Sequence, residues 1–182
     1  MADDLLAAYP KTVKLKDGTT VNLRVLIPQD RAEVGQFFER VPSEDRAFLK
    51  DEMMNREEIE IWLDLLDPER ETSLVAVLGN RIIGTAVLER RRSGWARHVG
   101  EIRIVADPAF RGRGIGHLLA QSIFQLAVKL GLEKVVAEMM ADRPEPIRVF
   151  ERLGFEAEAT LKGQVKDRRG RRHDLLVMAY NV

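Results

Sequence analysis

One segment constrains this chain more than any other: residues 105–127, which read VADPAFRGRGIGHLLAQSIFQLA. It joins an apolar stretch typical of a strand to an apolar-periodic stretch typical of a helix. Between the two, Gly112, Gly114 and Gly116 alternate with arginine and isoleucine. Because a plain connection needs one glycine at most, this spacing predicts a loop whose backbone is shaped for binding at the start of a helix.

The residue types in this loop indicate that it binds an anion. Successive glycines allow several backbone N–H groups to converge, and a helix N-terminus adds about half a positive charge. Arg111 and Arg113 strengthen that field, so we predict a cradle for phosphate or pyrophosphate. No Lys-Ser/Thr pair follows, and His117 replaces the third glycine of the dinucleotide pattern. The alternative is a flexible turn with solvated arginines.

Composition narrows the class of protein. The chain has 182 residues, 45% of them hydrophobic and 32% charged, which fits one globular domain with a sizeable core. Because 29 basic residues balance 29 acidic ones, the charge gives no argument for nucleic acid or membrane. Without cysteine there is no disulfide, thiolate metal site or cysteine nucleophile. We expect a cytoplasmic protein, since the start MADDLLAAYP lacks the basic region of a signal peptide.

Hydrophobic periodicity predicts a mixed α/β (α+β) single domain spanning 1–182, with residues 1–11 as a tail. A hairpin turns at Asp17-Gly18, and helices follow near 28–41, from Ser43, and over 56–66. An antiparallel meander occupies 72–106, and the opening segment supplies the next helix. A strand (133–141), a short helix (145–153) and two strands (155–165 and 173–182) complete the order.

The sequence RGRGIG, residues 111–116, resembles the acyl-coenzyme A signature of the GNAT family of N-acetyltransferases, Arg/Gln-x-x-Gly-x-Gly/Ala. Arg111, Gly114 and Gly116 fill its fixed positions. FERLGFE, residues 150–156, is similar to the later helix-to-strand junction of the family. The element order resembles the GNAT fold over roughly residues 12–181, with the motif core at about 72–181. The resemblance therefore implies a mixed, mostly antiparallel sheet flanked by helices.

The same resemblance implies a co-substrate, acetyl-CoA, and the residues that hold it. The loop amides would bind pyrophosphate, while the strand before the loop would separate from the next strand and hold the pantetheine arm. The implied contacts are Ile104, Val105, Arg111, Gly112, Arg113, Gly114, Ile115, Gly116, Arg143 and Phe150. A side chain at Gly114 is expected to enter the space meant for pyrophosphate. No metal is expected.

Acyl transfer to an amine requires a base near the thioester carbon. Glu101 is the candidate, since its strand leads into the loop and its apolar neighbours would favour the uncharged acid. Bacterial protein-lysine acetyltransferases of the family are similar in placing a glutamate there. The alternative is a surface glutamate paired with Arg103 or with an arginine of the neighbouring strand.

The chain departs from the family at two positions. Many members have asparagine where Arg143 stands and a tyrosine, acting as general acid, where Phe150 stands. Neither is present, so no tyrosine of that helix is available to protonate the departing thiolate; water could suffice, and the acid for this step stays unassigned. These departures keep open a second class of function, a non-catalytic acyl-CoA sensor.

The remaining polar features carry weaker predictions. We expect His98 and His117 to lie at the surface, and no spacing among the histidines predicts a metal site. ERRRSGWARH and KDRRGRRH are expected to be solvated hairpin turns, with attraction of an acidic acceptor as the alternative. An RNA-binding domain built on these arginines is a third, weaker class.

These patterns together predict an enzyme that transfers acetyl from acetyl-CoA to a primary amine by direct attack. We favour a protein lysine as acceptor, with a small-molecule amine as the alternative. Neither nucleic acid nor membrane is expected as a partner. Both a monomer and a homodimer fit the sequence.

Overall fold

The structure is a computed structural model that describes residues 9–42, 56–167 and 169–182. Its elements run in the order β1 (Lys11–Lys14), β2 (Thr20–Val25), η1 (Pro28–Asp30), α2 (Arg31–Arg40), α4 (Arg56–Asp64), β3 (Glu71–Leu78), β4 (Arg81–Arg90), β5 (Val99–Ala106), η2 (Pro108–Phe110), α5 (Ile115–Lys129), β6 (Lys134–Met140), α6 (Pro144–Glu151), β7 (Glu156–Lys166) and β8 (Arg172–Asn181). The predicted fold class is confirmed. The helix expected from Ser43 lies outside the described residues, and Lys11, assigned to the tail, already belongs to β1.

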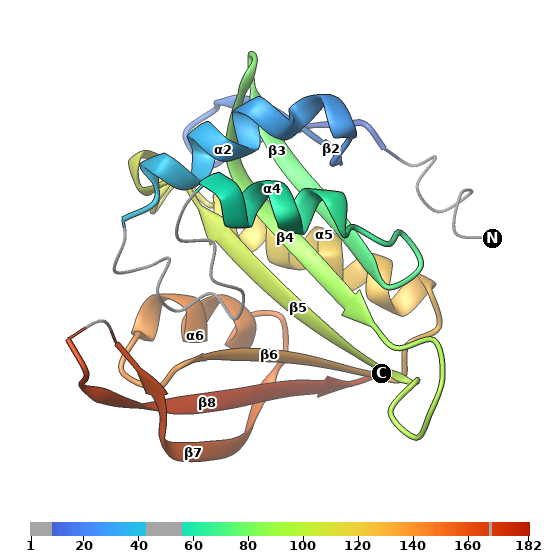
Figure 1. Ribbon diagram of the computed structural model, residues 1–182, viewed down its shortest axis with the longest axis vertical. Coiled ribbons are helices and arrows are strands. Elements are labelled where there is room, and N and C mark those ends of the chain that lie inside the picture. The colour runs from blue at the N-terminus through green and yellow to red at the C-terminus, as the bar shows by residue number, and fades with distance from the viewer. Residues whose placement is uncertain (1–8, 43–55, 168) are drawn as a thin grey trace.

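Eight strands form one mixed sheet in the order β1-β2-β3-β4-β5-β6-β8-β7. Every neighbouring pair is antiparallel except β5–β6, which is parallel. That parallel ladder holds only three residue pairs and ends at Glu101 opposite Val136. Beyond Glu101 the two strands separate, and Figure 1 shows β5 and β6 opening from a common end. We call Ile102–Ala106, paired with β4 but not with β6, the splayed segment.

Helices cover both faces of the sheet. α2 and α4 lie in front of β3, β4 and β5, and α5 lies behind them (Figure 1). On the α2/α4 face, Phe37, Phe38 and Ile59 pack with valines of β3. On the opposite face, the apolar side of α5 forms the larger core with β2–β6. β4 is buried on both faces because it lies between these two layers.

Local signals set the turns that position the candidate site. Gly18 adopts φ +84°, and the Asp17 carboxylate accepts a hydrogen bond of 2.9 Å from the Thr19 amide, as a tight hairpin turn requires. Gly84 brings β4 close to α5, since a Cβ there would lie 2.7 Å from Leu119 Cδ1 and 3.2 Å from Val105 O. The start of α5 is thereby held against the sheet beside the splayed segment.

Candidate active site

The glycine–arginine loop, which we define as Asp107–Gly114, delivers the chain from β5 to α5 with the conformation that its glycines allow. Gly112 has φ +74°, and Gly114 has φ +94° as the left-handed N-cap of α5. The Leu118 N–H donates to Gly114 O at 3.0 Å, which makes the first bond of the helix. The amides of residues 115–117 precede that bond and lie at the N-terminal end of α5, where an anion is stabilised.

Asp107 anchors the first residue of this loop, a role that the sequence did not predict. Its side chain is 3% exposed and accepts hydrogen bonds from Arg81 (2.7 Å), Arg40 (3.1 Å) and the Ala109 amide (3.0 Å). Burial opposes ionisation, but the bonds from Arg81, the Ala109 amide and Arg40 outweigh it and lower the pKa of the Asp107 carboxyl. The loop therefore starts at a fixed, charged anchor on the sheet.

The two arginines of the loop are Arg111 and Arg113. Both are exposed. The Arg113 guanidinium lies 3.3 Å from an Asp17 carboxylate oxygen and 5.1 Å from the centroid of the Phe110 ring. Part of the Arg113 charge is thus balanced within the protein.

Lys16 is a second residue that the sequence analysis missed. Its amide donates to Arg113 O at 3.3 Å, and its side chain lies along Gly114. A Cβ on Gly114 would lie 3.3 Å from Lys16 Cγ, so a side chain there would meet the β1–β2 turn. That such a side chain would also enter the pyrophosphate space stays a prediction. By contrast, a Cβ at Gly116 would meet open space.

Ile104 and Val105 lie in the splayed segment, on opposite faces of the sheet. Ile104 packs against the α5 core, and Val105 packs against the α2/α4 cluster. Their backbones pair with β4 on one side only, since the β5–β6 ladder ends at Glu101. Among the strands that the structure describes, none pairs with this backbone on its β6 side.

Glu101 stands at the point where β5 and β6 separate. It is partly buried, and one carboxylate oxygen is shielded from solvent. By strand alternation it shares the α2/α4 face with Arg103 and Val105, and its register partner on β4 is Glu89. Arg103 forms an ion pair with Glu89. The candidate base therefore lies beside a paired arginine and glutamate, a few residues before the glycine–arginine loop.

Arg143 and Phe150 belong to the α6 region. Arg143 is the exposed N-cap residue of α6. Phe150 is 5% exposed and packs in the main core, with its ring centroid 5.1 Å from that of Phe155. Its predicted contact with the coenzyme stays a prediction, and the side chain as it lies is part of the core.

The histidines occupy three environments. His98 is exposed, as expected, whereas His117 is partly buried with its Nδ1 shielded from solvent, contrary to the expected surface position. His173 lies between two carboxylates, with Nδ1 3.1 Å from Asp142 and Nε2 3.2 Å from Asp167. Within the described residues, no group of three His, Cys, Asp or Glu is arranged to hold a metal ion.

The described chain thus places a splayed strand pair, Glu101 where the strands separate and the glycine–arginine loop at the N-terminus of α5 in one strand–loop–helix unit. The sequence model described as "Acetyltransferase (GNAT) family" matches residues 36–155. The chain belongs to this family. No helix in residues 9–42, 56–167 and 169–182 is long and apolar enough to cross a membrane.

The curated relatives that match part of the chain include two acetyltransferases with small-molecule names. Mycothiol acetyltransferase of Mycobacteroides abscessus is 43% identical over 63 residues, which is 34% of this chain and 21% of that protein. Putative phosphinothricin acetyltransferase YwnH of Bacillus subtilis is 32% identical over 78 residues, 43% of this chain and 47% of that protein. The matched part thus spans from about a fifth to about half of the length of these relatives.

Solved structures agree over most of the chain. A GNAT acetyltransferase from Streptococcus pneumoniae superposes with a TM-score of 0.77 at 23% identity, covering 89% of this chain and 99% of that chain. A GNAT phosphinothricin acetyltransferase from Sinorhizobium meliloti, solved in complex with AcCoA, gives 0.73 at 21% identity and covers 89% and 88%. At these identities the likeness establishes the fold.

Proposed function

We propose that this protein transfers the acetyl group of acetyl-CoA to a primary amine by direct attack. The single observation that carries the proposal is the position of Glu101, which closes the short β5–β6 ladder just before the strands separate towards the glycine–arginine loop. A coenzyme with its pyrophosphate at the start of α5 and its arm along the splayed segment would bring its thioester towards this face of β5. The AcCoA bound by the Sinorhizobium meliloti structure supports the choice of donor.

The proposed reaction balances without a covalent enzyme intermediate. The amine nitrogen forms a bond to the thioester carbon, the carbon–sulfur bond breaks, and coenzyme A leaves as a thiolate. Glu101 takes the proton that the amine loses, as a general base. Neither Arg143 nor Phe150 offers a hydroxyl, so we infer that water protonates the thiolate.

The acceptor is proposed as a primary amine of one of two kinds. The names of the two curated relatives support a small molecule, since they specify mycothiol and phosphinothricin. The glutamate on β5, together with phenylalanine rather than tyrosine at position 150, favours a protein lysine. A coenzyme A release screen over amino acids, polyamines and lysine peptides separates these acceptors, and the proposed cytoplasmic location is checked by cell fractionation.

Glu101→Gln tests the proposed chemistry. Glutamine keeps the shape of glutamate but cannot accept a proton, so turnover should fall by about 10²–10⁴-fold at neutral pH. The defect should shrink at high pH, where more of the amine is already deprotonated. Acetyl-CoA affinity, measured by calorimetry, should stay close to that of the wild type.

Wild-type turnover across the whole pH range in Glu101→Gln would rule out this base. A wild-type protein that binds acetyl-CoA but releases no coenzyme A with any amine would support the sensor alternative. Loss of coenzyme binding in the variant would instead indicate a structural role for Glu101.

A further inference from the structure

The connection between β4 and β5, residues 91–98, presents an aromatic side chain to solvent, and we call it the Trp95 loop. Trp95 is 91% exposed, although tryptophan is on average a highly buried residue type. Gly94, with φ +91°, turns the chain directly before it. The loop extends past the ends of β4 and β5 (Figure 1). A large aromatic ring at the surface of a loop is typical of a site that binds a partner.

The base of the Trp95 loop is fastened to the connection between α4 and β3. The Arg90 amide donates to Arg70 O at 2.7 Å, and the Arg90 guanidinium donates to Pro68 O at 2.8 Å. Arg92 forms an ion pair with Glu69 on the same connection. The exposed ring is therefore presented from a base that is tied to the rest of the fold.

Two arginines of the Trp95 loop are available to a partner. Arg91 and Arg97 are exposed, and among the described residues neither guanidinium has a hydrogen-bond or ion-pair partner. They lie on either side of Trp95 in the sequence. Because a guanidinium binds a carboxylate through two parallel N–H donors, this combination favours a ligand with acidic side chains.

The limited extent of the positive charge favours a peptide over a membrane or a nucleic acid. Asp67 and Glu69 lie on the connection to which the loop is fastened, so carboxylates border the arginines. A broad anionic surface would meet these carboxylates as well, and the 29 basic residues of the chain are balanced by 29 acidic ones. One or two acidic side chains can contact Arg91 and Arg97 alone.

The Trp95 loop also lies close to the candidate base. It precedes β5, whereas the glycine–arginine loop follows β5, so the two loops lie at opposite ends of this strand. Glu101 follows Arg97 by four residues, which span at most about 14 Å. A peptide whose lysine reaches Glu101 would cover the same distance with about three to five residues. The coenzyme, at the other end of β5 in the proposed complex, would leave the Trp95 loop open.

We propose that the Trp95 loop is a docking site for an acidic segment of a protein acceptor, about three to five residues from the lysine that is acetylated. This inference rests on the proposed function and selects the protein lysine from the two kinds of acceptor. Trp95 packs against the peptide, and Arg91 and Arg97 pair with its carboxylates. Because these contacts are the same in the ground state and in the transition state, they lower KM and leave kcat unchanged.

The first experiment compares lysine peptides that differ only at the positions three to five residues from the lysine, which carry glutamate or serine. With the full chain and acetyl-CoA, coenzyme A release should give a kcat/KM about 3–10-fold higher for the glutamate peptide, as expected for exposed ion pairs. This preference should shrink as the salt concentration rises. The double variant Arg91→Gln/Arg97→Gln should lose it. Trp95→Ala should raise KM for both peptides and leave kcat unchanged.

Matched controls separate docking from a general loss of activity. Arg152→Gln removes an exposed arginine at the end of α6, and Val128→Ala trims an exposed side chain of α5. Both should leave the peptide KM unchanged. A small amine without flanking residues should react equally well with the wild type and with every variant of the loop. Thermal unfolding shows that each variant is folded.

A second experiment measures docking without turnover. In a fluorescein-labelled glutamate peptide, norleucine replaces the lysine, so the peptide binds but cannot accept an acetyl group. Fluorescence anisotropy should show its affinity falling by about 3–10-fold in the double arginine variant and in Trp95→Ala.

A preference for glutamate that disappears in the loop variants supports the proposal. Equal reaction of the two peptides with the wild type, or an unchanged preference in the folded variants, overturns it. Binding of the loop to phosphatidylserine vesicles or to oligouridylate, without a preference for the glutamate peptide, also overturns it. Failure of the proposed function looks different: no amine would release coenzyme A, whereas the norleucine peptide would still bind through the loop.

Discussion

At the scale of single residues, Asp107 is the side chain on which the glycine–arginine loop depends most. Asp107→Asn keeps the shape but replaces the charged partner of Arg81 and Arg40, so we expect a loss of about 2 kcal/mol in the free energy of unfolding. Because the folded pKa is lowered, the stabilisation is present above the unfolded pKa, near 4, and is lost as pH falls through the folded pKa. The loss in the free energy of unfolding of Asp107→Asn, measured by urea unfolding, should therefore have its full value at pH 7 and become smaller in strongly acidic solution.

Gly114 and Gly112 form a matched pair for a second test. Both have positive φ, so alanine at either position costs about 1 kcal/mol in backbone strain. Only at Gly114 does the added Cβ also press on Lys16, whereas at Gly112 it would meet nothing within 4 Å. We expect Gly114→Ala to lower the melting temperature and coenzyme affinity more than Gly112→Ala does.

Lys16→Ala in the Gly114→Ala background should remove that difference, because it removes the atoms that the new Cβ meets. Equal effects of the two single glycine variants would contradict the contact with Lys16. Calorimetric titration with coenzyme A, together with thermal unfolding, measures both quantities.

At the scale of elements, His173 on β8 joins the loop before α6 to the β7–β8 hairpin. Hydrogen bonds to Asp167 and Asp142 raise the pKa of His173. The side chain of Asp167 is 8% exposed, and burial would raise its pKa, but bonds from His173 and Arg171 lower it overall. A protonated imidazole between two carboxylates should thus fasten the two segments together.

The sign of the pH effect follows from the raised pKa. The stabilisation is fully present below the unfolded pKa of histidine, near 6.5, and is lost as pH rises through the folded value. The difference in melting temperature between the wild type and His173→Gln should therefore be largest in mildly acidic solution and decline in alkaline solution. A difference in melting temperature that grows with pH would contradict the proposed stabilisation by His173.

At the scale of the whole molecule, the features that could be predicted are those determined by residues close together in the sequence. Strand alternation, the Asp17-Gly18 turn and the apolar face of α5 depend on neighbouring residues, so the element order and the glycine–arginine loop could be predicted. The contacts of Asp107 with Arg40 and Arg81, of Lys16 with Gly114, and of Arg103 with Glu89 depend on register and on packing between distant segments. No local pattern contains that information, and these contacts were missed.

The same limit explains why the burial of Phe150 and the partial burial of His117 could not be predicted. The Phe150 position was inferred from a motif, but burial beside Phe155 depends on how α6 packs. The partial burial of His117 likewise depends on what covers the start of α5. Motif spacing predicts which residues are close along the chain, whereas burial is a property of the assembled layers.

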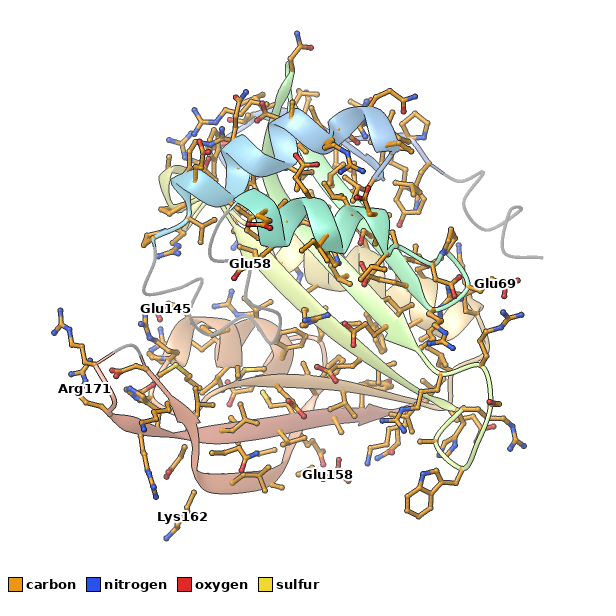
Figure 2. All side chains as sticks on the ribbon, viewed as in Figure 1. Glu58, Glu69, Glu145, Glu158, Lys162 and Arg171 are labelled. Atoms are coloured by element: carbon orange, nitrogen blue, oxygen red, sulfur yellow. The ribbon has the colours of Figure 1, made fainter. Side chains whose placement is uncertain are left out.

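The separation of β5 from β6 gives the sheet a third edge, in its interior, besides the outer edges at β1 and β7. Exposed strand edges recruit further strands, and β7 is already open to solvent, with Lys162 projecting outward (Figure 2). In the proposed complex, the amide-bearing pantetheine arm would act as the missing strand of this inner edge. Coenzyme A should then slow amide hydrogen exchange within Ile102–Ala106 while leaving β7 unchanged, and equal protection of both would show that the ligand merely stabilises the whole fold.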